Sequence, residues 1–213
     1  MKKITTLLIT AMFTLATSAF AGGMIGVKYG TGDLDGTSKA YTAGSTDIAA
    51  QSGSKSNEFG AIFAEVNVKE SPISVGLEYV PFDADITLNG STSGASANVS
   101  NYTTLYALAM AEIPNGNASV YAKLGYSQAD IGTVKANGHS TTINSNSTEL
   151  EGIMYGVGIQ SKELAMGIVA RAEYTFTEFD DISVTTTSNG SASVQKTASG
   201  ELSTMTVSLS KSF

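Results

Sequence analysis

Residues 202–213 read LSTMTVSLSKSF, and the alternation of side-chain types in this stretch decides the fold. Met205, Val207, Leu209 and Phe213 fall on one face, whereas the other face carries Thr204, Thr206, Ser208, Ser210 and Ser212. A period of two along a chain is typical of a β-strand with one apolar and one polar face. The end of the chain is therefore predicted to be a strand that separates two different environments.

Seven further segments alternate in the same way, which predicts eight strands in all. All eight segments, the last one included, are 23–32, 57–69, 72–82, 101–113, 118–129, 148–160, 163–177 and 202–213. The connections after the second, fourth and sixth segments are short, with Ser161 and Lys162 as the last of these turns. The other connections are long, low in charge and rich in Ser, Thr, Gly and Asn, and they include 37–56, 87–100, 132–147 and 183–200. This strict alternation of short turns and long loops is typical of an up-and-down membrane β-barrel.

The N-terminus resembles an export signal. Lys2 and Lys3 precede an apolar stretch, and Ala19-Phe20-Ala21 provides a small-x-small cleavage site. The apolar stretch is shorter than the ~20 residues that a membrane-spanning helix needs. We therefore expect residues 1–21 to be a signal peptide and residues 22–213 to form one β-barrel domain.

Composition narrows the function classes. The chain contains no cysteine, which excludes disulfides and cysteine metal sites. Its net charge of −7 falls to −9 when Lys2 and Lys3 are removed, so nucleic acid is an improbable partner. No cofactor and no metal ion is predicted.

The apolar faces indicate which side of each strand meets which environment. In the fifth segment, Val120 and Leu124 lie on one face and Lys123 lies on the other. In the seventh, Ile168 and Ala172 lie on one face and Arg171 lies on the other. Tyr79, Tyr126, Tyr174 and Phe176 lie near the long-loop ends, where an interfacial aromatic belt belongs. We expect the apolar faces to point outward to lipid and the polar faces to point inward. The seventh segment's prediction includes Leu164 and Met166 on the lipid face, whereas the faces of the second and fourth segments stay open.

With these features, the chain resembles the outer-membrane β-barrel superfamily of small eight-stranded proteins, which includes the membrane domain of outer membrane protein A and outer membrane protein X. The resemblance implies an all-β, membrane-spanning, antiparallel, up-and-down barrel in a Gram-negative outer membrane. It implies that Met205, Val207, Leu209 and Phe213 form the signal that the barrel-assembly machinery reads, although Lys211 departs from the usual pattern. Because the chain stops at the last strand, we expect no periplasmic cell-wall-binding domain. Outer-membrane lipid and lipopolysaccharide are the implied surroundings, and the barrel is expected to be a monomer.

The polar faces carry charges at mid-strand. These are Lys28, Glu65, Glu78, Lys123, Arg171 and Glu173, with Glu112 as a further candidate. Isolated charges are costly to bury, so we predict that these side chains pair inside the barrel. Such a network either fills and rigidifies a narrow barrel or lines a gated ion path.

Acidic residues gather at the bases of all four long loops. They are Asp33, Asp35, Asp83, Asp85, Asp130, Glu178, Asp180 and Asp181. Carboxylates of this kind bind divalent cations that bridge lipopolysaccharide phosphates, or they simply keep the loop bases hydrated. Hydration is the preferred interpretation, because only a fragment of a calcium-binding loop occurs, at residues 33–36.

Three functions stay open at the level of sequence. The preferred one is a structural or surface-interaction barrel whose long loops bind a surface ligand. The second is a narrow channel for ions or small polar solutes. The third is a lipid-modifying enzyme using His139, the sole histidine, beside Ser140. We expect no enzymatic activity, because catalytic partners need rigid support that a loop does not provide.

Overall fold

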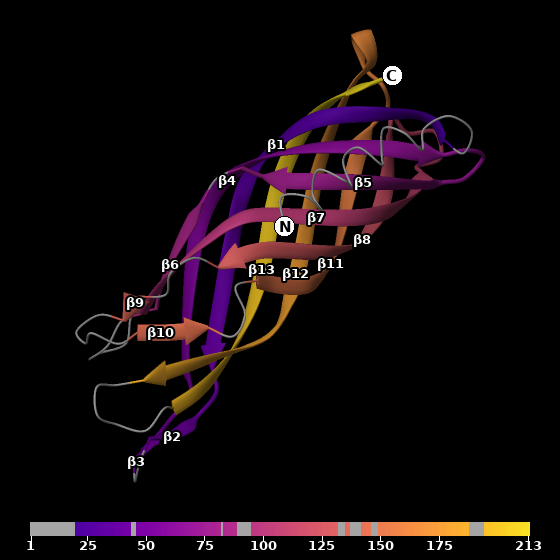
Figure 1. Cartoon of the computed structure of the whole chain (residues 1–213). Coiled ribbons are helices and arrows are strands. Elements are labelled where there is room, and N and C mark those ends of the chain that lie inside the picture. Colours follow the sequence, from indigo (N-terminus) through magenta and orange to yellow (C-terminus); the bar gives the residue numbers. More distant parts are fainter. Residues whose placement is uncertain are drawn as a thin grey trace.

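The computed structural model describes residues 20–43, 46–81, 83–88, 95–131, 135–136, 142–145, 149–187 and 194–213. Eight long antiparallel strands form a closed barrel, which confirms the predicted fold class (Figure 1). They are β1 (Phe20–Ser38), β4 (Gln51–Val68), β5 (Ile73–Val80), β7 (Ala95–Glu112), β8 (Ala118–Ile131), β11 (Glu149–Ser161), β12 (Ile168–Thr187) and β13 (Val194–Ser212).

Each long strand pairs with its neighbours along the chain, so the topology is up-and-down. The ring closes between the first and last strands, where the register runs from Met24 opposite Ser212 to Ser38 opposite Ala198. Closure leaves no sheet edge along this seam, and a closed sheet is the only β-structure that satisfies its backbone within a membrane.

The two faces of the barrel are inverted relative to a water-soluble protein. Val27, Leu124 and Val207 point outward with exposed fractions of 60%, 62% and 59%. Lysine, arginine, glutamate, serine and threonine side chains lie buried on the inner face. An apolar wall of this kind requires lipid around it, as in outer-membrane barrels.

The faces that the sequence left open are settled in β4 and β7. Phe63 points inward at 3% exposure, while its neighbour Ile62 points outward at 53%. Tyr106 and Leu108 are buried inside, whereas Leu105 lies on the outer wall. In these two strands large apolar groups therefore occupy both faces, which is why the alternation looked weak.

The long strands extend past the predicted loop boundaries, so a large part of the predicted loops is paired strand. β1 and β4 remain in register up to Ser38 opposite Gln51, and β12 and β13 up to Thr186 opposite Val194. Short strands add to this region: β2 (Tyr41–Ala43), β3 (Thr46–Ile48), β6 (Ala84–Leu88), β9 (Lys135–Ala136) and β10 (Thr142–Ser145). The prediction missed these extensions because their side chains are polar on both faces.

The opposite end of the barrel has three short turns, at residues 69–72, 113–117 and 162–167. The last of these is longer than predicted, because β12 begins at Ile168 and not at Glu163. Residues 165–167 form a single 3₁₀ turn (η1), in which Met166 has a φ of 64° and Gly167 a φ of 74°. Placing Leu164 and Met166 on a strand face was therefore wrong. We call the end of the barrel with the three short turns the turn end, and the opposite end, with the long connections, the hairpin end.

Among the described residues, none of the helices has the length and apolar character needed to cross a membrane.

Candidate functional site

The centre of the barrel holds a ring of four alternating charges. The Lys28 Nζ lies 2.6 Å from Glu78 Oε2 and 2.6 Å from Glu173 Oε1. The Lys123 Nζ lies 3.0 Å from the same two oxygens. The four side chains come from β1, β5, β8 and β12, so the ring joins strands on several sides of the barrel. We call these four residues the charge quartet.

A second ion pair lies closer to the turn end. Arg171 Nη1 and Nη2 each donate a hydrogen bond of 2.8 Å to one oxygen of Glu65. The Arg171 Nε donates to Gln160 Oε1 at 2.5 Å, and the Tyr106 hydroxyl donates to Glu65 Oε2 at 3.2 Å. A fork-to-fork pair with its remaining groups hydrogen-bonded has the geometry in which a buried ion pair offsets its desolvation.

Aromatic rings fill the space between these charges. Lys123 Nζ lies 4.0 Å from the centre of the Tyr106 ring, and Arg171 Cζ lies 5.3 Å from that of Tyr121. The Tyr121 hydroxyl donates a 3.0 Å hydrogen bond to Glu173. Phe63 contacts the charged groups of both Lys28 and Arg171. Cations over aromatic faces are stabilised further when water is excluded.

Each of the three rings lies against a glycine on the neighbouring strand. Gly26 pairs with Phe63, Gly76 with Tyr106 and Gly158 with Tyr121. A Cβ atom added at Gly76 or Gly158 would lie 2.3 Å from the tyrosine ring, and one at Gly26 would lie 2.6 Å from the phenylalanine ring. The missing side chains make the room that the rings occupy.

All six predicted interior residues therefore lie inside the barrel, and the structure joins them in two networks. Three cations face three anions, each of the six residues is at most 7% exposed, and every one of them has an opposite charge within 3.0 Å. Glu112, the further candidate, lies exposed at the turn end. The interior rings of Phe63 and Tyr106 were not assigned from sequence, because their glycine partners are known only once the register is known.

The interior is also occupied towards the hairpin end. A register shift in β7 between Ser100 and Thr103, and another in β12 between Phe179 and Ile182, interrupt the regular pairing. Next to these bulges, the Tyr102 and Phe179 rings meet edge to face with centroids 6.4 Å apart. The Tyr102 hydroxyl forms hydrogen bonds with Ser127 and Thr177, which lie on two other strands. These residues lie inside the barrel on the hairpin-end side of the charge quartet.

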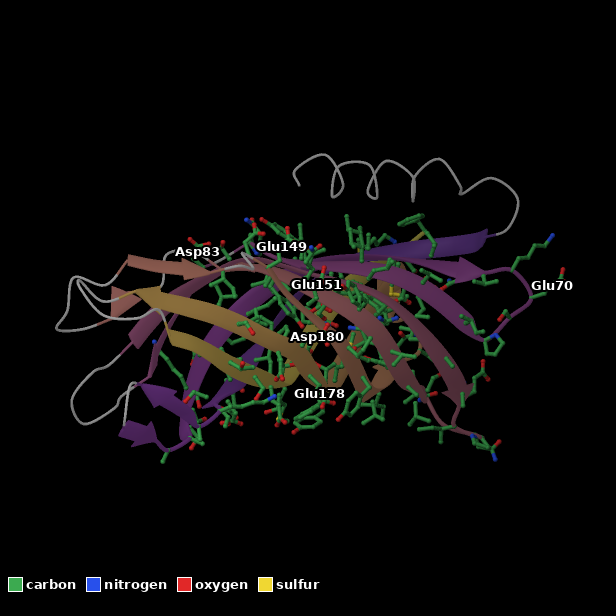
Figure 2. The ribbon with its side chains drawn as sticks, turned by 60° about the horizontal axis from the view of Figure 1, so that its bottom comes forward. Glu70, Asp83, Glu149, Glu151, Glu178 and Asp180 are labelled. Carbon is green, nitrogen blue, oxygen red and sulfur yellow. The ribbon has the colours of Figure 1, made fainter. Side chains whose placement is uncertain are left out.

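The described side chains of the predicted acidic rim lie on the outer surface towards the hairpin end, apart from the charge quartet. Glu201 is directly opposite Asp35 on one neighbouring strand and Glu178 on the other, and all three are exposed. Like charges placed opposite one another destabilise a sheet unless water screens them, so this row lies above the hydrocarbon. Figure 2 shows Glu178 and Asp180 on the barrel wall and Glu70 at the far turn end.

The other rim residues have individual partners. Asp33 accepts a hydrogen bond from Ser56, Asp181 pairs with Lys39, and Asp130 accepts from Asn101 Nδ2 at 2.8 Å. Asp83 is exposed, and the side chain of Asp85 lies outside the described residues. The described part of the chain contains no group of three or more side chains arranged to hold a metal ion.

The four residues of the expected assembly signal lie on the outer wall, three of them on β13 and Phe213 directly after it. Met205, Val207, Leu209 and Phe213 have exposed fractions of 69%, 59%, 57% and 74%. Backbone hydrogen bonds of 3.0 Å join Phe213 to Gly23 in both directions, at the seam that closes the ring. The apolar stripe is thus continuous with the lipid-facing surface. His139 and Ser140, the catalytic pair considered above, lie outside the described residues.

Comparison with known proteins gives one family and a set of structural likenesses. Residues 4–209 match the family described as "Outer membrane protein beta-barrel domain". Ail, the attachment invasion locus protein of Yersinia pestis, is 12% identical with a TM-score of 0.44, covering 91% of this chain and 100% of that chain. The N-terminal β-barrel domain of Pseudomonas aeruginosa OprF is 13% identical with a TM-score of 0.36, covering 82% and 98%. The Escherichia coli outer membrane protease OmpT is 11% identical with a TM-score of 0.41, covering 92% and 99%. A comparison with curated proteins found no match.

Proposed function

The chain belongs to the outer membrane protein β-barrel domain family, and on that premise we propose that it is a closed structural barrel that carries a surface for interaction outside the cell. It resides in the outer membrane, where short turns face the periplasm and long connections face outward. The observation that carries the proposal is the charge-balanced, aromatic-packed interior. A barrel filled in this way acts as a structural support, and the hairpins above it make the interactions outside the cell.

The interior supports a closed barrel for two reasons. An eight-stranded barrel leaves an interior just wide enough for side chains, and here Phe63, Tyr106 and Tyr121 occupy it together with the charges. The charge quartet is neutral, so neither ion sign gains from entering it. One feature favours a narrow channel as the second candidate: each lysine already contacts both glutamates, so partners could exchange as an ion passes.

Conductance separates the closed barrel from the narrow channel. The purified protein in planar bilayers is expected to show no discrete current steps above the leak. The compensated variant Lys123→Ala with Glu173→Ala keeps the Lys28–Glu78 pair and removes two large side chains, so it is expected to conduct and serves as the positive control. Discrete steps from the unchanged protein would contradict the closed barrel and establish the second candidate.

The hairpin end supports an interaction role because its strands are hydrogen-bonded well beyond the lipid-facing wall. Beyond the level of Met205, β1 extends from Gly32 to Ser38, by about 20 Å at ~3.3 Å per residue. Over this whole length it pairs with both β4 and β13. A two-sided sheet costs less to order on binding than a free loop, because its backbone conformation is already fixed. Such a surface can present polar groups to a ligand in a defined arrangement.

Trimming the hairpins tests this role. Replacing residues 38–51 and 187–193 with Asn-Gly turns keeps the paired bases at Thr37–Ser52 and Thr186–Val194. We expect the trimmed protein to insert as efficiently as the full chain, while whole-cell adherence to a panel of immobilised surface ligands falls to background. Replacement of Asn115-Gly116 at the turn end by Asp-Gly is the matched control and is expected to change neither. Loss of insertion, or adherence that survives trimming, would contradict the proposal.

The remaining partners follow from the same placement. We propose that outer-membrane lipid and lipopolysaccharide surround the apolar wall, that the β13 stripe is read by the barrel-assembly machinery, and that the protein acts as a monomer. No catalytic role is proposed. An unchanged mass of lipid A upon expression is the corresponding expectation for the enzymatic alternative.

A further inference from the structure

The periplasmic turn between β11 and β12 exposes large apolar side chains at its tip. Met166 is 85% exposed and Leu164 is 53% exposed. The turn tips at residues 69–72 and 113–117 carry mainly charged residues, proline, asparagine and glycine, with Ile113 at 37% as their most exposed large apolar group. Figure 1 shows the 162–167 turn projecting beyond the strand ends beside the C-terminus.

The conformation of this turn is held by the last strand. The Lys211 ammonium group donates to the Met166 carbonyl oxygen, and Ser212 Oγ donates to the Gly167 carbonyl oxygen at 3.1 Å. The Lys162 N–H donates to the Asn117 carbonyl oxygen of the neighbouring turn at 2.9 Å. Met166 has a positive φ, which residues other than glycine rarely adopt, so neighbouring contacts must maintain this conformation. The apolar tip is therefore a supported element of the barrel.

The tip continues the lipid-facing wall. On β13 the outward side chains run from Val207 and Leu209 through Lys211 to Phe213, which is 74% exposed. Ile168, the first residue of β12, lies directly opposite Lys211, so Met166 lies just beyond this level. Lys162, Glu163 and Lys211 place ionised groups beside the apolar ones, which is the mixture of a membrane–water interface.

We propose that residues 162–167 form a lipid-binding foot, which inserts Leu164 and Met166 into the interfacial layer of the periplasmic phospholipid leaflet. The partner is the phospholipid itself, because the tip adjoins the lipid-facing wall and its charged groups suit a headgroup layer. The foot fixes the height of the barrel in the membrane at the closing seam. The proposal rests on the membrane location of the barrel and does not depend on what the outer hairpins bind.

Single tryptophans test the foot, because the chain contains no tryptophan of its own. Met166→Trp and Leu164→Trp are each reconstituted in vesicles of phosphatidylethanolamine and phosphatidylglycerol, with and without brominated acyl chains. Val207→Trp on the outer wall and Asn115→Trp in another periplasmic turn are the matched controls. Retained heat-modifiable mobility on gels shows that each variant is folded.

We expect both foot variants to emit about 10–15 nm to the blue of Asn115→Trp, as an interfacial indole does, and to be quenched by bromine less strongly than Val207→Trp. These vesicles contain no other protein, so quenching by bromine identifies lipid as the partner. Emission and acrylamide quenching equal to those of Asn115→Trp, with Val207→Trp still quenched by bromine, would overturn the foot and favour a periplasmic protein as its partner. Absence of quenching at Val207→Trp would instead contradict the membrane placement of the wall, and with it the foot.

Discussion

Replacement of Glu65 by leucine is expected to lower the free energy of unfolding by about 3–5 kcal/mol, because Arg171 is then a buried charge without its partner. In the intact barrel two 2.8 Å hydrogen bonds join these side chains, of which Glu65 is 0% and Arg171 4% exposed. Urea unfolding in phospholipid vesicles, followed by circular dichroism, measures the change.

The matched control is the double variant Glu65→Leu with Arg171→Met. A buried ion pair that is replaced as a whole by apolar groups is often neutral or stabilising, so the double variant is expected to unfold within about 1 kcal/mol of the parent. The parent and both variants all carry Tyr106→Phe, because the Tyr106 hydroxyl would otherwise lose its acceptor when Glu65 is replaced. Equal losses in the single and double variants would show that the cost arises from packing and not from the unpaired charge.

Replacement of Leu124 by arginine is expected to lower the free energy of unfolding in vesicles by about 2–4 kcal/mol, the cost of placing arginine near the midplane on the lipid face of a barrel. Leu124 is 62% exposed, so in a water-soluble protein the same change would stay within about 0.5 kcal/mol. The sign and size of the effect therefore report directly on what surrounds the wall.

Ser54→Arg is the control for this substitution. Ser54 is exposed on the same outward face, but it lies on the part of β4 beyond the lipid-facing wall, opposite Asp35. Its replacement is expected to cost between 0 and about 1 kcal/mol. If both variants are equally tolerated in the same urea titration, the outward assignment of the apolar faces is wrong.

The sequence predicted the barrel because lipid imposes a simple rule on alternate residues. Outward-facing positions such as Val27, Leu124 and Val207 must be apolar because they meet hydrocarbon. The resulting period of two can be recognised in one strand without knowing its partner strands. The same rule explains where prediction stopped. Beyond the membrane both faces meet water, so the pairing of Thr37 with Ser52 leaves no alternation to detect.

The interior could be predicted in content but not in connectivity. Charge at mid-strand was enough to place Lys28 and Glu173 inside, since a charge facing lipid is costly. Their pairing depends on the register of strands that are distant in sequence, which no local pattern encodes. Leu164 and Met166 were misplaced for a related reason: they fit the parity of the seventh strand, and only the positive φ of Met166 removes them from it.

The charge quartet also bears on the fidelity of assembly. Its members come from four strands, and successive residues of a strand face opposite sides, so a slip of one residue at any of these strands would turn an ionised group towards the hydrocarbon. Such a mispaired barrel would lose two ion pairs and gain an exposed charge in lipid at the same time. The quartet thus makes the native register much lower in free energy than registers shifted by one residue. Closure of the nascent sheet is favourable only when all four strands are in their native register.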